Sequence, residues 1–152
     1  MRLLHRPAGE GGEGGEGGEG GEGGEGVEGG EGVEGKGDAR DARVLASRVA
    51  VADSHLARAR GLMFRRSVPA DYALAFPFDA ADVRWLHMLF VPFAIDAVWT
   101  VGGRVRRVER LDAWTGLARA EADLVFELPA GAAGTVTPGD RVELREETDD
   151  RG

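Results

Sequence analysis

The sequence predicts an α+β, β-rich domain: a mainly antiparallel sheet, curled or barrel-like, with two short helices. Short apolar segments bounded by turn residues recur from Arg43 to Arg145, and their spacing favours an antiparallel meander. Six or seven strands in a flat sheet would leave exposed edges, and curling the sheet covers them. Two segments with helix-forming or helix-starting residues lie between the strands, which places the domain in the α+β class.

The first 37 residues differ sharply in composition from the rest. They hold 17 of the 25 glycines and nine of the 27 acidic residues, and residues 11–26 repeat Gly-Gly-Glu. Glycine has the largest backbone entropy to lose, and regularly spaced glutamates repel one another, so residues 1–37 are predicted to be a disordered tail. Residues 38–146 then form a single domain, and residues 147–152 an acidic C-terminal tail.

The charge and hydropathy patterns exclude several classes of partner. The net charge is −8, and residues 1–37 account for −6 of it, with nine glutamates against three basic residues. An acidic tail repels phosphates, so no nucleic-acid partner is expected. No segment approaches the roughly 18 apolar residues of a membrane span, and the N-terminus lacks the apolar region of a secretory signal. We therefore expect a cytoplasmic protein with no membrane partner. The sequence contains no cysteine, so a thiolate metal site is not expected either.

The predicted domain begins with a strand and a helix. Residues 43–52 alternate in polarity and are predicted to form a strand. Asp53 or Ser54 can cap a short helix that runs to Arg60 and ends at Gly61. The segment 62–64, Leu-Met-Phe, is predicted to anchor the core.

The rest of the domain is predicted to be mostly strands. Five further strands are expected, at residues 72–78, 84–91, 93–101, 104–111 and 122–128. The Gly102-Gly103 pair is predicted to be a short hairpin turn, because glycine adopts positive φ freely. Pro129 suits the first turn of a second helix over residues 130–136, and a final strand follows at 141–145. In the strand at 122–128, Ala122, Leu124, Phe126 and Leu128 are predicted to face the core and Asp123, Val125 and Glu127 the other side.

Four motifs in this order resemble those of the family called domain of unknown function 192. They are Arg60-Gly61-Leu62-Met63-Phe64-Arg65, the His87-Met88 pair leading to Phe93-Ala94-Ile95-Asp96, Glu127-Leu128-Pro129-Ala130-Gly131, and Gly139-Asp140. The resemblance covers about residues 44–144 and implies a small β-rich fold with short helices. It implies no established activity. Many members carry Trp-Met-Lys-Asn-Thr where this chain has residues 87–91, His-Met-Leu-Phe-Val, so a mechanism that needs that lysine and asparagine cannot be transferred.

Asp96 is the most suggestive polar residue, because it lies in an almost wholly apolar run, residues 86–101. A buried carboxylate needs a cation and hydrogen-bond donors, or a position at the mouth of a pocket. The structural interpretation pairs Asp96 with Arg60, with Arg65 or with a backbone turn. The functional interpretation places Arg60, His87 and Asp96 together as a ligand-binding site at the rim of the sheet.

Other candidate sites have weaker support in the sequence. A metal centre would need a further ligand such as Glu127 beside His87 and Asp96, without any compact ligand spacing, so no metal and no cofactor are expected. The basic cluster Arg104, Arg106, Arg107 and Arg110 is predicted to be a solvated, ion-paired face, since no aromatic residue interleaves with it. Trp99 is expected in the core. Trp114 is either an exposed contact residue or folded back over the sheet edge.

These residues favour a non-enzymatic ligand-binding or protein-interaction module. In that hypothesis Arg60 binds a small anionic ligand, Asp96 orients it and His87 lines the wall; the alternative partner is a protein. The second hypothesis is a small hydrolase or isomerase with Asp96 as general base and His87 as general acid. No motif in the sequence specifies a reaction.

Overall fold

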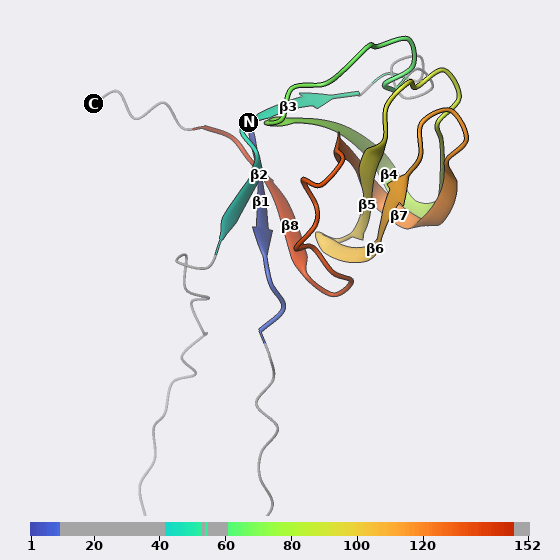
Figure 1. Ribbon diagram of the computed structural model, residues 1–152. Coiled ribbons are helices and arrows are strands. Elements are labelled where there is room, and N and C mark those ends of the chain that lie inside the picture. Colours follow the sequence, from blue (N-terminus) through green and yellow to red (C-terminus); the bar gives the residue numbers. More distant parts are fainter. Residues whose placement is uncertain (10–41, 53, 55–60, 148–152) are drawn as a thin grey trace, which may run out of the picture.

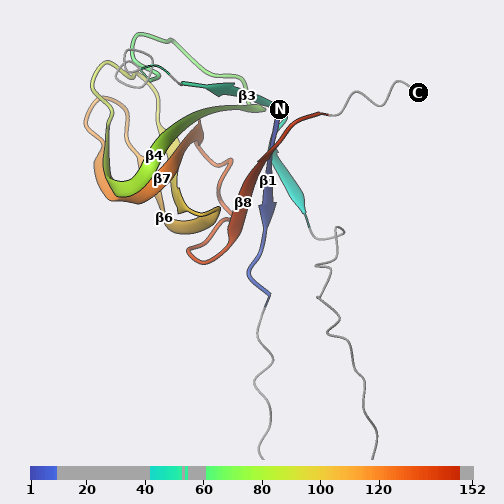
Figure 2. The ribbon, with the colours of Figure 1, turned by 180° about the vertical axis from the view of Figure 1, so that it is seen from behind.

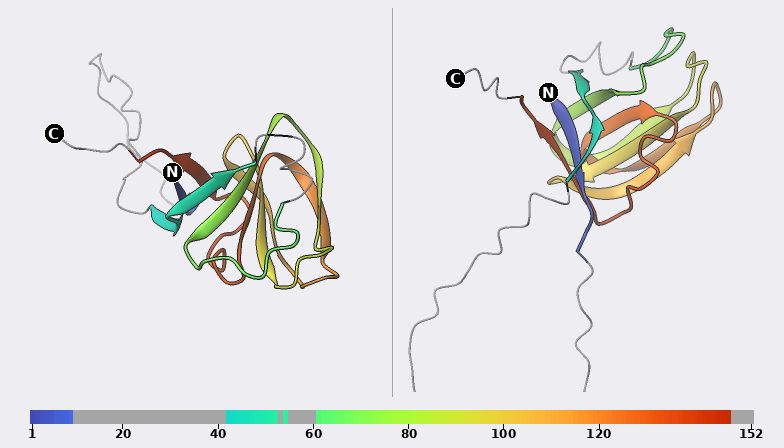
Figure 3. Two further views of the ribbon diagram at one scale, coloured as in Figure 1. Left: turned by 90° about the horizontal axis from the view of Figure 1, so that it is seen from above. Right: turned by 60° about the vertical axis from the view of Figure 1, so that its left-hand side comes forward.

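The described residues of the computed structural model, 1–9, 42–52, 54 and 61–147, form a single eight-stranded sheet (Figure 1). The strand order is β2-β1-β8-β6-β5-β7-β4-β3. The strands are β1 (Arg2–Arg6), β2 (Arg43–Ala46), β3 (Arg48–Val51), β4 (Tyr72–His87), β5 (Ile95–Val101), β6 (Arg104–Leu111), β7 (Leu117–Pro129) and β8 (Arg141–Arg145). All strand pairs are antiparallel except β3 with β4, which is parallel. The views in Figure 3 show how strongly this sheet curls.

The predicted α+β class is wrong for the described part of the chain, which contains strands and turns but no helix. Residues 130–136 form successive tight turns, with bonds such as Ala132 N–H to Pro129 O at 3.0 Å. Gly131 adopts a φ of 94°, outside the helical region, and its N–H group donates to a side chain. The first predicted helix lies, apart from Ser54, outside the described residues. The sheet is also open, ending at β2 and β3, so it is not a closed barrel.

Most predicted strands are present, several of them with different boundaries. The predictions at 104–111 and 141–145 are confirmed as β6 and β8, and Gly102 and Gly103 turn between β5 and β6 with φ of 57° and 79°. Residues 43–52 form two strands instead of one. The two strands predicted at 72–78 and 84–91 are one long strand, β4, whose pairing with β7 shifts register between Pro77 and Asp82. β4 and β7 bend together along their length (Figure 2).

Residues 2–6, which the sequence analysis grouped with the tail, form β1 in the interior of the sheet. β1 pairs with β2 on one side and β8 on the other. Leu3 is fully buried, and His5 is 2% exposed. The His5 Nε2 atom lies 2.7 Å from Asp140 Oδ2, and Ala8 N–H donates to Asp140 Oδ1 at 2.9 Å. Apolar burial and this polar pair both attach β1 to the sheet.

Both faces of the central strands are buried. One apolar cluster surrounds Trp99 and includes Leu74, Ala97 and Val125; a second surrounds Phe126. Trp99 is fully buried, as predicted. The prediction that only one face of the strand at 122–128 packs in the core is wrong, because Val125 and Glu127 are also buried. Of the predicted anchors at 62–64, Leu62 is buried but Phe64 is 64% exposed.

Candidate functional site

Asp96 is a buried anchor for the turn after β7. It is 3% exposed, and Arg110 Nε donates to its Oδ1 at 2.8 Å. The backbone N–H groups of Gly131 and Ala133 donate to Oδ2 at 2.9 and 3.0 Å. Both carboxylate oxygens therefore have partners, which offsets the cost of burying the charge. The contacts fit the structural interpretation of Asp96, with Arg110 as the cation in place of Arg60 or Arg65.

His87 lies far from Asp96. It is exposed at the end of β4, and its Nδ1 atom accepts a hydrogen bond from Leu89 N–H at 3.2 Å. In the sheet, His87 is opposite Leu117 at the start of β7, whereas Asp96 is opposite Leu128 near the end of β7. The structure therefore does not bring these two side chains together as an acid–base pair. Arg60 is outside the described residues.

The basic cluster on β6 is largely paired with acids. Arg107 Nη2 lies 2.9 Å from Glu109 Oε2, and Arg106 lies 3.9 Å from Glu121. The bond to Asp96 raises the pKa of Arg110 above its usual value. Over residues 1–9, 42–52, 54 and 61–147, no three His, Asp or Glu side chains are close enough together to hold a metal ion. His87, Asp96 and Glu127 accordingly do not form the metal centre that the sequence analysis considered.

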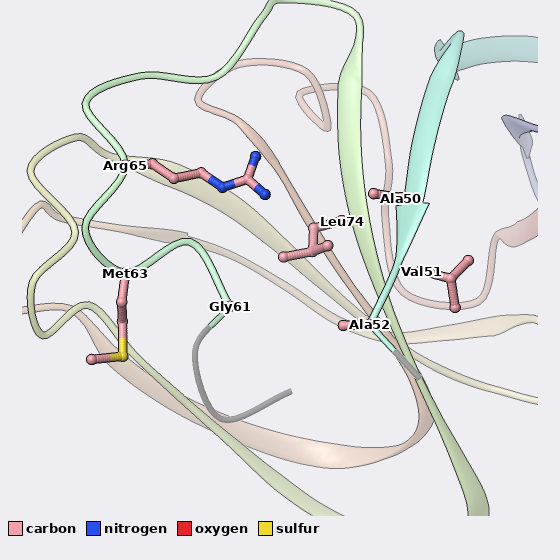
Figure 4. Close-up of a pocket in the computed structure, with 7 residues that line it drawn as sticks. All are labelled: Ala50, Val51, Ala52, Gly61, Met63, Arg65 and Leu74. Carbon is pink, nitrogen blue, oxygen red and sulfur yellow. The ribbon is translucent and has the colours of Figure 1, made fainter. Parts of the chain in front are cut away.

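A pocket of about 410 Å³ lies between β3, the start of β4 and the loop at 61–65. The side chains that line it are apolar apart from one cation, Arg65, whose side chain extends from the loop toward β3 and β4 (Figure 4). The lining residues are Ala50, Val51, Ala52, Gly61, Met63, Arg65 and Leu74. The Arg65 guanidinium also lies 5.2 Å from the centre of the Tyr72 ring, a cation–π contact that orients it. We call this the Arg65 pocket.

A buried carboxyl group, Glu127, lies behind one wall of the Arg65 pocket. Glu127 is opposite Leu74 on β4 and Ala97 on β5, so its side chain shares their apolar face. A Cβ atom added at Gly61 would lie 3.6 Å from each of its carboxyl oxygens. Glycine at this position, with a φ of 47°, therefore lets the pocket wall approach the carboxyl group closely.

Glu127 is the most strongly perturbed acid of the described residues. Burial raises its pKa to about 8, and the opposing charge of Arg65 lowers it by less. Its Oε2 atom has no hydrogen-bond partner, and neither has the buried Tyr72 hydroxyl group. A carboxyl group with such a pKa holds its proton at neutral pH. In that form the group is able to donate a hydrogen bond, and Arg65 is the charged side chain of the pocket.

Sequence reasoning identified neither Arg65 nor Glu127 as members of one site. Glu127 alternates with apolar residues, a pattern that normally marks the solvent face of a strand. The feature that could have identified Glu127 as buried is the length and central position of β7, since a central strand of a curled sheet is buried on both faces. Arg65 lay inside a motif attributed to the family, without any indication of which strand its loop would face.

Comparison with protein families gives a match over most of this fold. A family model matches residues 38–144, well over half of the chain, and its description is "Uncharacterized ACR". The chain belongs to the DUF192 family. This confirms the resemblance inferred from the four motifs. The matched range of this DUF192 protein includes the Arg65 pocket, Glu127 and Asp96, but not β1, which adds a strand from outside the family domain.

Two solved structures resemble this DUF192 protein. A protein from Sinorhizobium meliloti described as a "putative transcription regulator" is 26% identical and has a TM-score of 0.57 over 62% of this chain and 79% of its own. A protein of unknown function from Novosphingobium aromaticivorans is 22% identical, with a TM-score of 0.61 over 70% of this chain and 80% of its own. No curated protein matches the chain. The similarities support the fold and leave the activity open.

Proposed function

We propose that this DUF192 protein is a non-enzymatic binding module for a small anionic ligand, and that the Arg65 pocket is its site. The single observation that carries the proposal is a cation among otherwise apolar side chains of a pocket, backed by a buried carboxyl group whose Oε2 atom has no hydrogen-bond partner. Pockets of roughly 300 to 1,000 Å³, mostly apolar with a few polar groups, are typical of small-molecule sites. This pocket lies within that range.

The charges of the pocket favour a carboxylate or a phosphate. The Arg65 guanidinium can donate two parallel hydrogen bonds to either group. Protonated Glu127 adds no negative charge beside it. Ionisation of Glu127 would place a carboxylate behind Gly61 and reduce the attraction for an anion. Anion affinity is therefore expected to fall as the pH rises through about 8.

The geometry supports binding and not catalysis. The enzymatic hypothesis required Asp96 and His87 to act together, and they lie near opposite ends of β7. Asp96 has a structural partner at each oxygen. Neither residue lines the Arg65 pocket.

Calorimetric titration with succinate and with inorganic phosphate tests the proposal. Arg65→Gln is expected to weaken binding of the better probe at least tenfold, corresponding to about 1.4 kcal/mol. The control is Arg145→Gln, which removes an exposed arginine on β8, outside the pocket, and is expected to leave affinity unchanged. If neither probe binds the wild-type chain, or if both variants bind as well as wild type, the proposed site is wrong.

A further inference from the structure

Three loops lie together at the end of the sheet remote from β1 and β8 (Figures 1 and 3). They carry large apolar side chains that are exposed to solvent. Phe64 is 64% exposed, Trp114 57%, Leu89 54% and Phe90 44%. The Phe64 and Phe90 rings stack with their centres 5.1 Å apart. We call these four residues the aromatic tip. The Arg65 pocket shares the first loop with the tip, but the tip residues do not line it.

The backbone holds the aromatic tip in a strained conformation. Phe64, Phe90 and Trp114 have φ of 64°, 60° and 67°, and they are the non-glycine residues with positive φ in the described part of the chain. Such a conformation is costly for a bulky side chain and persists only where the surroundings impose it. The cost falls on three residues whose side chains gain little burial in return. Strain of this kind is concentrated at functional positions.

Hydrogen bonds between the loops impose that conformation. Phe64 N–H donates to Phe90 O at 2.9 Å, and Trp114 N–H donates to Val91 O at 3.0 Å. Gly116 allows the third loop to approach closely, since a Cβ atom there would lie 2.7 Å from Met88 Cγ. The three loops are thus joined, and their apolar side chains are presented as one unit.

Two arginines lie directly beside the aromatic tip. Residues 88–94 carry no charged side chain, and the exposed Arg65 and Arg66 follow Phe64 directly. Asp112 is the acidic residue of the third loop. The three loops, residues 61–71, 88–94 and 112–116, hold two arginines and two aspartates, and Asp71 forms an ion pair with Arg48 on β3 at 2.9 Å. The exposed Arg65 and Arg66 beside Phe64 therefore favour a partner with a negative surface at this end.

The area of the aromatic tip is too small for a stable contact between two copies. Four side chains of roughly 200 Å² each, about half exposed, present on the order of 400 Å². A stable protein interface needs about 800 Å² from each partner. Protruding Phe, Leu and Trp side chains beside arginines instead suit the interfacial region of a bilayer, where aromatic rings partition and arginines reach the headgroups.

We propose that the aromatic tip inserts into the surface of a lipid bilayer that carries anionic headgroups. The side chains of Phe64, Leu89, Phe90 and Trp114 enter the headgroup region, and Arg66 contacts the lipid phosphates. The expectation of no membrane partner rested on the lack of a spanning segment, and no helix of the described residues could span a membrane. A surface contact through loop tips does not need one.

Co-sedimentation of the full chain with vesicles tests this proposal. At 0.15 M salt the screening length is about 8 Å, so charges far from the tip contribute little. The wild-type chain is expected to sediment with phosphatidylcholine vesicles containing phosphatidylglycerol, and at least tenfold less with pure phosphatidylcholine. The tryptophan fluorescence, to which Trp85 and Trp99 also contribute, should shift to the blue only in the presence of the anionic vesicles, and this shift should be absent when Trp114 is replaced.

The variants are designed to fold. Asparagine tolerates positive φ, so the triple change Phe64→Asn, Phe90→Asn and Trp114→Asn removes the rings and relieves the strain. This variant is expected to lose vesicle binding at least tenfold and to keep its thermal stability. The matched control is Trp85→Thr, since Trp85 on β4 is 56% exposed but lies outside the tip. Its binding should equal that of wild type.

Three results would overturn the proposal. The wild-type chain could fail to sediment with anionic vesicles. The triple variant could sediment as well as wild type while Trp85→Thr does not, which would locate the contact on the sheet. Sedimentation equilibrium could instead reveal a dimer that the triple variant abolishes, which would make the tip an interface between copies. None of these results depends on ligand binding in the Arg65 pocket.

Discussion

At the scale of single residues, two buried carboxyl groups of the same sheet have opposite surroundings. Asp96 receives three donors from Arg110, Gly131 and Ala133, so its charge is compensated. Glu127 lies on an apolar face with an unpartnered oxygen, so the neutral form is favoured. Asp96 therefore holds the turn at Gly131 and Ala133, whereas the protonation of Glu127 changes at about pH 8.

Replacing Asp96 tests its structural role. Asp96→Ala leaves the N–H groups of Gly131 and Ala133 and the Arg110 guanidinium without their acceptor, so the free energy of unfolding should fall by about 3 kcal/mol. Urea unfolding of wild type and Asp96→Ala measures this fall in the free energy of unfolding. Arg110→Gln should cost much less, because two of the three donors remain. Equal stability of wild type and Asp96→Ala would contradict this account.

Glu127 should make the stability of the protein depend on pH in the direction opposite to a typical carboxylate. Its pKa rises from 4.5 to about 8 on folding, so the unfolded chain loses its proton first. The stabilising contribution is complete below pH 4.5, decreases as the pH rises, and is lost by about pH 8. Urea unfolding of Glu127→Gln across this range should lack the decrease. A difference between the two proteins that does not change with pH would argue against a buried, protonated Glu127.

At the scale of elements, β1 connects the edge strand β2 to the rest of the sheet. Within the described residues β2 pairs only with β1, and β1 also pairs with β8. Asp140 supports this arrangement. Burial alone would raise its pKa, but hydrogen bonds from the backbone of Ala8 and Thr137 and from His5 lower the pKa to about 2. Its contribution to stability is present above pH 4 and is lost as the pH falls toward 2.

Removing β1 should destabilise the whole domain. Deletion of residues 1–9 exposes the edges of β2 and β8 and removes Leu3 and Leu4, each worth about 1.5 to 3 kcal/mol when buried. Urea unfolding should show a loss of at least about 3 kcal/mol. The matched control deletes residues 13–24 from the Gly-Gly-Glu repeat. It should change stability by less than about 1 kcal/mol, since the cost of loop closure varies slowly with length. If the two deletions lowered the free energy of unfolding equally, β1 would contribute nothing specific to stability.

Sequence reasoning performed well where local chemistry decides the structure. The Gly102-Gly103 turn and the strands β6 and β8 are specified by residues near each other in the chain. It failed where distant contacts decide. The second helix did not form because Asp96, about 35 positions earlier, captures two of its N–H groups. β1 was assigned to the tail because its partners are about 40 and 135 residues away.

At the scale of the whole molecule, the candidate site also depends on contacts between residues that lie far apart in the chain. The alternation around Glu127 resembles a half-exposed strand, and only the curled sheet and the loop at 61–65 bury its second face. Asp96 was correctly identified as an unusual residue. Its partners depended on the register of β5, β6 and β7, which no local pattern contains. The fold thus separates a structural carboxylate, Asp96, from the Arg65 pocket and from the exposed aromatic tip.

The most direct test of the proposed site is a nuclear magnetic resonance titration of the full chain with succinate at pH 7. We predict that the largest amide shifts occur around the Arg65 pocket, at Gly61, Met63, Arg65 and Leu74. The same titration at pH 9, with Glu127 ionised, should require a higher succinate concentration for half of the shift. Shifts centred on the turn at Gly131 and Ala133 near Asp96, or no shifts at all, would contradict the central claim that the Arg65 pocket binds small anions.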